Sequence, residues 1–243
     1  MKQSIFEIIR HERLTETVFR MVLKGDTSDI TATGQFVNVQ LSGKFLRRPI
    51  SVCDWDQDTL TLVYKVVGSG TEQMSRMQAG EKLDILTGLG NGYNLEAGFE
   101  KPLLIGGGVG VPPLYALCKA LVKKGLTPVA VLGFNKKEEI FLKEDFEKLG
   151  AEVIVATADG SYGVKGFVTD AMKGLEYDYF FTCGPEPMLK AVSAASECSG
   201  QLSFEERMAC GFGACMGCSC KTKYGNKRIC KDGPVLVKEE VVW

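Results

Sequence analysis

Cysteines are the most chemically distinctive residues of this sequence, which has 9 of them in 243 residues. Four fall within residues 210–220, and Cys230 follows shortly after. The total number of cysteines is odd, and four of them are crowded together, which does not suggest a disulfide framework. In a reducing compartment their thiolates are available as soft ligands for a metal. The sequence therefore predicts a metal site near residues 210–230.

The spacing of these cysteines indicates which metal group they hold. Cys210, Cys215 and Cys218, followed by Cys230, give the C-x4-C-x2-C…C pattern of plant-type [2Fe–2S] sites. Zinc is the alternative, although it prefers two C-x2-C knuckles. Cys230 comes sooner than the fourth cysteine of plant-type ferredoxins, so its assignment depends partly on the resemblance described below. Cys220 is expected to be a bystander, because four thiolates already satisfy two irons.

Glycines between the cysteines fit this interpretation. A loop that wraps around sulfides needs positive φ angles and backbone N–H groups that point at sulfur. Gly211, Gly213 and Gly217 could supply such angles.

Two glycine-containing turns are typical of a nicotinamide nucleotide site. Residues 106–113, GGGVGVPP, follow a strand-like run and open a helical pattern, a context in which backbone N–H groups reach a pyrophosphate. The third glycine of G-x-G-x-x-G is absent, so a simple packing turn is the alternative. Residues 183–188, CGPEPM, end the last strand-like run, where a doubly wound sheet places its ligands. The predicted NAD site consists of Gly106, Gly107, Gly108, Gly110, Asp159, Cys183, Gly184 and Pro185.

Asp159 favours NAD over NADP. An acidic side chain at the end of the third strand-like run would bind a free ribose 2′-hydroxyl and repel a 2′-phosphate. A plain turn role is the alternative, because Gly160 and Ser161 follow it. Cys183 is expected to orient the nicotinamide, unless it is an ordinary buried cysteine.

The elements that must position these residues form two domains and a module. Residues 1–98 hold short apolar runs, such as 17–23, 36–41 and 59–67, which predict an antiparallel β-barrel or sandwich. One helix should follow residues 68–71 and run through Met77. Residues 99–200 alternate strand-like and helical runs, which predicts an α/β domain with a doubly wound parallel sheet. Its strand-like runs are residues 103–105, 129–134, 152–157 and 179–183, and its helical runs are residues 114–122, 138–149, 168–172 and 187–196.

Residues 201–243 complete the expected organisation. One strand-like run, residues 201–205, leads into the cysteines. The segment is too short and too rich in glycine to bury a core of its own, so a cofactor should organise it.

The order of the motifs resembles the ferredoxin–NADP reductase superfamily over residues 1 to about 200. These motifs are R-P-x-S at residues 48–51, G-x-G-T at 68–71, G-x-G-x-x-P and C-G-P. The resemblance implies that Arg48 binds a flavin pyrophosphate and that Ser51 approaches flavin N5. Ile50 replaces the tyrosine of that family. The implied FAD site is Arg48, Pro49, Ile50, Ser51, Lys65, Val66, Val67, Gly70 and Thr71.

The whole chain resembles the electron-transfer subunits of type B dihydroorotate dehydrogenases, including R-R-P-I-S and C-G-x-G-x-C-x-G-C. This resemblance implies a heterotetramer in which the chain passes electrons between NAD and an FMN-containing catalytic partner, in pyrimidine biosynthesis. The small subunits of NADH-dependent ferredoxin:NADP oxidoreductases are also similar, which leaves a ferredoxin-linked or sulfide-metabolising partner as an alternative. A non-cysteine cluster ligand is expected in that family, whereas all four positions here are cysteine.

Composition excludes several other functions. A net charge of −1 provides no basic field for nucleic acid, and no segment has the roughly 20 apolar residues of a membrane span. The first residues lack an apolar signal core, so the expected compartment is the cytoplasm. His11, the single histidine, is expected at the surface, which leaves no base for an organic substrate and favours a catalytic partner chain. A zinc-stabilised nucleotide-binding module is the non-redox alternative.

Overall fold

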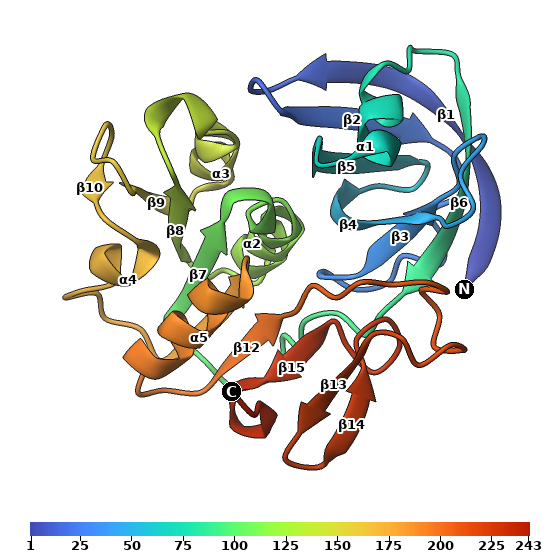
Figure 1. The fold of residues 1–243 in the computed structure, drawn as a ribbon. Helices are drawn as coiled ribbons and strands as arrows, with labels where there is room; N and C mark the ends of the chain where they lie inside the picture. The colour runs from blue at the N-terminus through green and yellow to red at the C-terminus, as the bar shows by residue number, and fades with distance from the viewer.

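The first 89 residues form a closed barrel in the computed structural model, which describes residues 1–243 (Figure 1). Its strands are β1 (Lys2–Arg13), β2 (Val18–Lys24), β3 (Phe36–Val39), β4 (Arg48–Trp55), β5 (Thr59–Lys65) and β6 (Lys82–Leu89), in the order β1-β2-β5-β4-β3-β6. All neighbours are antiparallel. In β6 every second residue from Leu83 to Leu89 is buried, as expected for a strand with one face on a core. The predicted antiparallel barrel is confirmed.

The single helix of this region, α1 (Ser69–Ser75), begins where the sequence predicts. It ends before Met77, so the expected helix is too long by about half a turn. Met74 is fully buried in the barrel core, which anchors the helix.

A parallel sheet forms the second unit. Its strands β7 (Pro102–Gly107), β8 (Val129–Phe134), β9 (Glu152–Thr157), β10 (Val164–Lys165) and β11 (Tyr179–Cys183) lie in the order β10-β9-β8-β7-β11. Helices α2 (Pro113–Lys123) and α3 (Lys143–Leu149) pack with one apolar cluster, and α4 (Val168–Ala171) and α5 (Glu186–Ala195) with another. Leu104 joins the first cluster, while Leu103 and Ile105 join the second, so the helices cover both faces. The predicted doubly wound sheet is confirmed.

Residues 138–149 do not form the single helix that the sequence predicts. A short 3-10 turn covers Lys137–Glu139, and α3 starts only at Lys143. Between them Phe141 and Leu142 are buried, and Leu142 adopts a left-handed conformation with φ of 62°. Burying both side chains in the core interrupts the helix.

The tail of the chain is built into the same sheet. Strand β12 (Gly200–Ser203) pairs in parallel with β11, and β15 (Val235–Val237) pairs antiparallel with β12. The strand predicted at residues 201–205 therefore ends at Ser203. Residues 204–218 between β12 and β13 carry Cys210, Cys215 and Cys218 and are called the cysteine loop below. The hairpin of β13 (Ser219–Thr222) and β14 (Gly225–Arg228) follows this loop and lies below the barrel, next to β15 (Figure 1).

His11 is partly buried on β1 rather than at the surface, so that expectation is wrong. Its Nδ1 lies 2.8 Å from the carbonyl oxygen of Met77, and its Nε2 lies 2.9 Å from the hydroxyl of Tyr64. The imidazole thus joins β1, β5 and the segment that follows α1, so His11 is a structural residue. None of the helices of this chain has the length and apolar content to cross a membrane.

Candidate functional site

A cleft of about 570 Å³ opens between the barrel and the carboxyl ends of the parallel strands. Thr15, Thr17 and Lys65 line it from the barrel, and residues 107–110 together with Gly184 and Pro185 line it from the sheet. This volume is in the range of cofactor sites, and the carboxyl edge of an open α/β sheet is where such sheets bind ligands.

The two glycine-containing turns of the predicted NAD site are in contact. A Cβ atom on Gly110 would lie 2.2 Å from the carbonyl oxygen of Cys183, and one on Gly107 would lie 2.4 Å from the sulfur of Met188. Backbone atoms cannot move aside as a flexible side chain can, so Gly110 is required for this close approach. Gly107, Gly108, Gly110, Gly184 and Pro185 line the cleft, whereas Gly106 packs beneath them against Val111.

Cys183 lies outside the cleft lining and is almost completely buried. Burial, with a smaller effect of the Glu205 carboxylate, raises the pKa of its thiol to about 12. The thiol is therefore neutral at physiological pH, in a packed environment beside Tyr93.

Asp159 also lies outside the cleft lining, although its neighbour Ala158 is part of it. Its Oδ1 accepts hydrogen bonds from the Ser161 hydroxyl at 2.6 Å and the Ser161 backbone N–H at 2.9 Å, and these bonds lower the pKa of the carboxyl. Another acidic residue, Glu139, does line the cleft, and its Oε2 accepts a hydrogen bond from Asn135 Nδ2 at 2.8 Å.

The residues of the expected flavin site meet at the start of α1. The guanidinium of Arg48 packs so closely on Gly70 that a Cβ atom there would lie 2.2 Å from Nε. The hydroxyl of Thr71 accepts hydrogen bonds from the N–H groups of Val67 at 2.9 Å and Gly68 at 3.3 Å. A guanidinium over a glycine cradle beside a helix start is a chemical fit for a pyrophosphate.

The other expected flavin residues lie along two neighbouring strands. Pro49, Ile50 and Ser51 are partly buried on β4, and Lys65 ends β5 in the cleft lining. Val66 is partly buried and Val67 is exposed.

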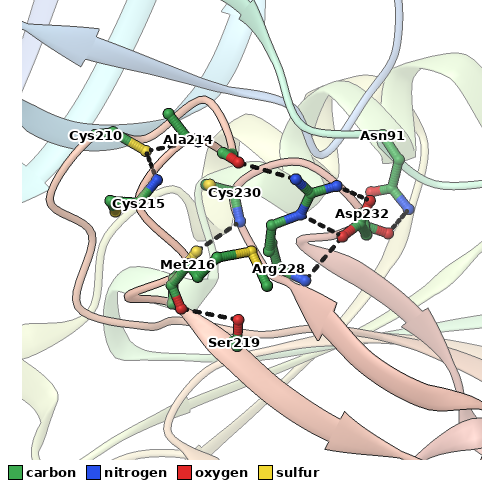
Figure 2. A network of polar contacts seen from close by, with 11 residues as sticks. Asn91, Cys210, Ala214, Cys215, Met216, Ser219, Arg228, Cys230 and Asp232 are labelled. Atoms are coloured by element: carbon green, nitrogen blue, oxygen red, sulfur yellow. Dashed lines mark hydrogen bonds and ion pairs between the residues drawn. The ribbon is translucent and has the colours of Figure 1, made fainter.

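In the cysteine loop, backbone N–H groups point at sulfur (Figure 2). The sulfur of Cys210 accepts hydrogen bonds from the N–H groups of Ala214 at 3.2 Å and Cys215 at 3.5 Å, and that of Cys218 accepts one from the N–H of Cys230 at 3.4 Å. Gly211 and Gly213 have the expected positive φ angles. Gly217 does not, and Met216 adopts one instead, with φ of 61°.

These N–H groups change the acidity of the thiol that they surround. Burial opposes ionisation of Cys210, but the N–H groups of Phe212, Cys215 and Ala214 outweigh it and bring the pKa down to about 6. At Cys230 burial dominates and raises the pKa to about 12. Cys220, half-buried on β13, also has a pKa raised by burial.

The cysteines are arranged in two pairs, Cys210 with Cys215 and Cys218 with Cys230. No three histidine, cysteine or carboxylate side chains are placed together as a metal site in this arrangement. The donor set nevertheless fits an iron–sulfur cluster, because it offers four thiols and several N–H groups directed at sulfur.

Arg228 holds the cysteine loop from one side (Figure 2). Its Nη1 donates to the carbonyl oxygen of Gly213 at 2.9 Å, and its Nε donates to Asp232 Oδ2 at 2.9 Å. Asn91, in the connection between barrel and sheet, donates to Val235 O at 2.8 Å and accepts from Val235 N–H at 3.1 Å. The loop is thus tied to the segment that joins the two larger units.

Sequence reasoning missed several cleft residues, including Thr15, Thr17, Glu139 and Glu205. Partial burial against the cleft wall raises the pKa of the Glu205 carboxyl above the ordinary value, although the residue as a whole is exposed. Only the pairing of the strands places Glu205 at the cleft. Ser203 of β12 is in register with Cys183 of β11, so the residues that follow both strands emerge at the same edge of the sheet.

Two family models match this chain. Residues 205–242 match the iron-sulfur cluster binding domain of dihydroorotate dehydrogenase B, and residues 104–194 match the oxidoreductase NAD-binding domain. The electron transfer subunit of dihydroorotate dehydrogenase B (NAD(+)) from Geobacillus sp. (strain WCH70) is 43% identical over 256 residues, which cover 100% of this chain and 99% of that protein. This chain belongs to that family.

Solved structures of other oxidoreductases share the fold of this electron transfer subunit family member. The structure of an NADH-dependent reduced ferredoxin-NADP oxidoreductase is 31% identical, with a TM-score of 0.89 over 98% of this chain and 90% of that chain. The flavohem-like FAD/NAD binding domain of nitric oxide dioxygenase from Vibrio cholerae shares the fold of the barrel and sheet, with 20% identity and a TM-score of 0.68 over 79% of this chain and 91% of that chain.

Proposed function

We propose that this chain is an oxidoreductase component that carries electrons between NAD(H) and a separate catalytic chain acting on dihydroorotate, in pyrimidine biosynthesis. The observation that carries the proposal is the arrangement of three binding regions in one chain. The cysteine loop packs against β3, the strand paired with the Arg48–Ser51 segment of β4, and the nucleotide cleft lies between barrel and sheet. The full-length relationship to electron transfer subunits supports the same conclusion.

Each region has its own task in this proposal. Bound FAD would exchange two electrons with NAD and single electrons with the cluster. NAD transfers electrons only in pairs and the cluster only one at a time, so the flavin is needed between them. Arg48, Gly70 and Thr71 would hold the pyrophosphate of FAD, and Ser51 would contact the reactive edge of the flavin.

The nucleotide and the cluster take the remaining residues. The glycines of residues 106–110, with Gly184 and Pro185, bind NAD, while buried Cys183 supports the turn beside the nicotinamide. Asp159 would bind the adenosine ribose. Cys210, Cys215, Cys218 and Cys230 hold the cluster. The corresponding functional units are residues 1–98, 99–200 and 201–243.

The partner in this proposal contains FMN and forms a heterotetramer with this chain. Two observations support a partner chain. The relatives are named electron transfer subunits, and the one histidine of this chain is held by two structural contacts outside the cleft. We place the complex in the cytoplasm, because none of the nine cysteines is joined in a disulfide.

An anaerobic titration of the reconstituted full-length chain with NADH tests the proposal. We expect flavin absorbance to bleach and a reduced [2Fe–2S] signal to appear by electron paramagnetic resonance. Dihydroorotate should give neither change with this chain alone and both after addition of the catalytic chain that copurifies with it. A colourless zinc protein, or reduction of the isolated chain by dihydroorotate, would overturn it. Copurification with a ferredoxin-linked enzyme instead would overturn the choice of partner.

A further inference from the structure

Strand β3 lies between the Arg48–Ser51 segment and the cysteine loop. Its residues Phe36 and Asn38 pair with Ser51 and Pro49 of β4. Side chains alternate along a strand, so Phe36 and Asn38 face one side while Val37 and Val39 face the barrel core. Phe36 packs in the same apolar cluster as Cys218 and Cys230. The outer face of β3 is therefore a wall shared by the expected flavin site and the cluster site.

Asn38 makes the polar contact across this wall. Its side chain is 1% exposed, and its Nδ2 donates to the carbonyl oxygen of Cys210 at 3.3 Å. This is the only hydrogen bond between residues 1–89 and residues 204–243. The backbone of Asn38 is fixed in turn, because its carbonyl oxygen accepts from Arg47 Nη1, which also pairs with Asp84 at 2.9 Å.

Gly211 interlocks with the same amide. A Cβ atom on Gly211 would lie 1.9 Å from Asn38 Nδ2, so the amide occupies the space that any side chain at this position would need. Gly211 is buried and has φ of 75°, a conformation that favours glycine. The loop can approach β3 this closely only with glycine here.

The oxygen of the same amide shows that asparagine carries a cost at this position. Asn38 Oδ1 is buried and has no hydrogen-bond partner. A buried acceptor without a partner is unfavourable, and an apolar side chain of similar size would avoid that cost. The hydrogen bond that Asn38 Nδ2 donates to the Cys210 carbonyl oxygen is the favourable contact that offsets this cost.

We infer that Asn38 is a positioning residue that holds the cysteine loop at a fixed separation from the flavin-binding strand pair, and so governs electron passage between flavin and cluster. The inference rests on the proposed function for its redox part. The mechanical part, the attachment of the loop to β3, stands on the contacts alone.

Two substitutions at Asn38 separate the hydrogen bond from packing. Asn38→Asp keeps the shape but removes the donor at neutral pH, and Asn38→Leu removes both polar atoms. Asn226→Leu is the control, because Asn226 is exposed on the hairpin of the same segment and makes no side-chain hydrogen bond. We expect amide hydrogen exchange of residues 208–217 to be on the order of tenfold faster in both Asn38 variants, and unchanged in the control.

The redox readout uses the loaded protein in stopped-flow experiments. Flavin reduction by NADH should keep its rate in the Asn38 variants, while the following reduction of the cluster slows severalfold. A role in general stability would move both steps or neither. Electron paramagnetic resonance of the reduced cluster should show a broadened signal, as expected for a loop with several arrangements.

Gly211→Ala tests the same contact from the loop, which keeps the inference testable if an Asn38 variant does not fold. Gly98→Ala is its control, since Gly98 has a matching φ of 74° and no atom within 4 Å of an added Cβ. We expect faster loop exchange in Gly211→Ala only.

Three outcomes can be told apart. Loop exchange and cluster reduction equal to wild type in the Asn38 and Gly211 variants would overturn the inference. Faster loop exchange with an unchanged cluster step would overturn its redox part. A wild-type chain without any reduced-cluster signal would instead overturn the proposed function.

Discussion

Gly110 lies against the carbonyl oxygen of Cys183, at a separation that leaves no room for a Cβ atom. Gly110→Ala should therefore push the two turns of the nucleotide site apart. We expect a loss of about 1–3 kcal/mol in the free energy of unfolding, as for other overpacked sites, and weaker NAD binding. Thermal unfolding and calorimetric titration with NAD measure the two effects.

Gly108→Ala is the matched control in the same turn. An added Cβ on Gly108 meets nothing within 4 Å, although its φ of 53° adds some backbone strain. Equal losses of NAD affinity in the two variants would show that an added methyl group anywhere in this turn weakens binding, and that the contact with Cys183 is not the cause.

Cys230 and Cys220 make opposite predictions about the cluster. Cys230 lies beside Cys218, whereas Cys220 pairs with Lys227 in the hairpin. Cys230→Ser should lose most of its iron and acid-labile sulfide, or show altered resonance g-values, while Cys220→Ser keeps the wild-type content and signal. A normal cluster in Cys230→Ser together with a defective one in Cys220→Ser would reassign the fourth ligand.

Arg228→Lys should weaken the attachment of the cysteine loop. Lysine cannot donate at once to Gly213 O and to both carboxylate oxygens of Asp232, as Arg228 does. We expect faster loss of iron to a chelator, followed by the decay of visible absorbance. Arg207→Lys, an exposed arginine in the same segment, should behave as wild type. Equal rates of iron loss in wild type, Arg228→Lys and Arg207→Lys would show that the Arg228 contacts do not hold the cysteine loop.

Glu205→Gln should change how stability depends on pH. The folded protein raises the pKa of this carboxyl above its ordinary 4.5, so the unfolded chain releases the proton first as pH increases. Wild type then binds more protons when folded, and its stability falls with rising pH above that value. Thermal unfolding temperatures of the cofactor-free proteins should agree near pH 4, with the variant higher at pH 7. A variant that is less stable at pH 7 would contradict this sign.

Asp159 and Glu139 are the two candidates for the carboxylate that contacts the adenosine ribose of NAD. Loss of a carboxylate that repels a 2′-phosphate should shift the preference toward NADPH by on the order of tenfold. The proposed function predicts this shift for Asp159→Asn, measured as the ratio of kcat/KM values for NADH and NADPH. A shift in Glu139→Gln alone would transfer the role to the acidic residue that lines the cleft.

Local patterns were sufficient to predict the units of the fold. β8, β9 and β11 match the predicted runs residue for residue, because parallel strands covered on both faces are mostly apolar segments. The same approach was wrong for residues 138–149, where tertiary burial of Phe141 and Leu142 overrides the helical pattern. It also could not reveal that β12 and β15 continue the sheet, since strand pairing depends on distant residues.

The candidate site divides in the same way. Glycine turns and cysteine spacing were visible because their chemistry needs particular residue types at fixed intervals. Thr15, Glu139 and Glu205 carry no such spacing and reach the cleft only through the fold. Asn38 is the extreme case, because its partner Cys210 is 172 positions away in the chain.

The pairing of β15 with β12 has a consequence for attempts to shorten this protein. Without residues after 204, the β12 strand would become the free border of the sheet, with its N–H and C=O groups open to pairing with other molecules. Gln201, Leu202 and Ser203 are all buried in the intact chain. A chain shortened by deleting residues 205–243 should consequently self-associate. These residues therefore protect the sheet edge from aggregation whether or not they bind iron.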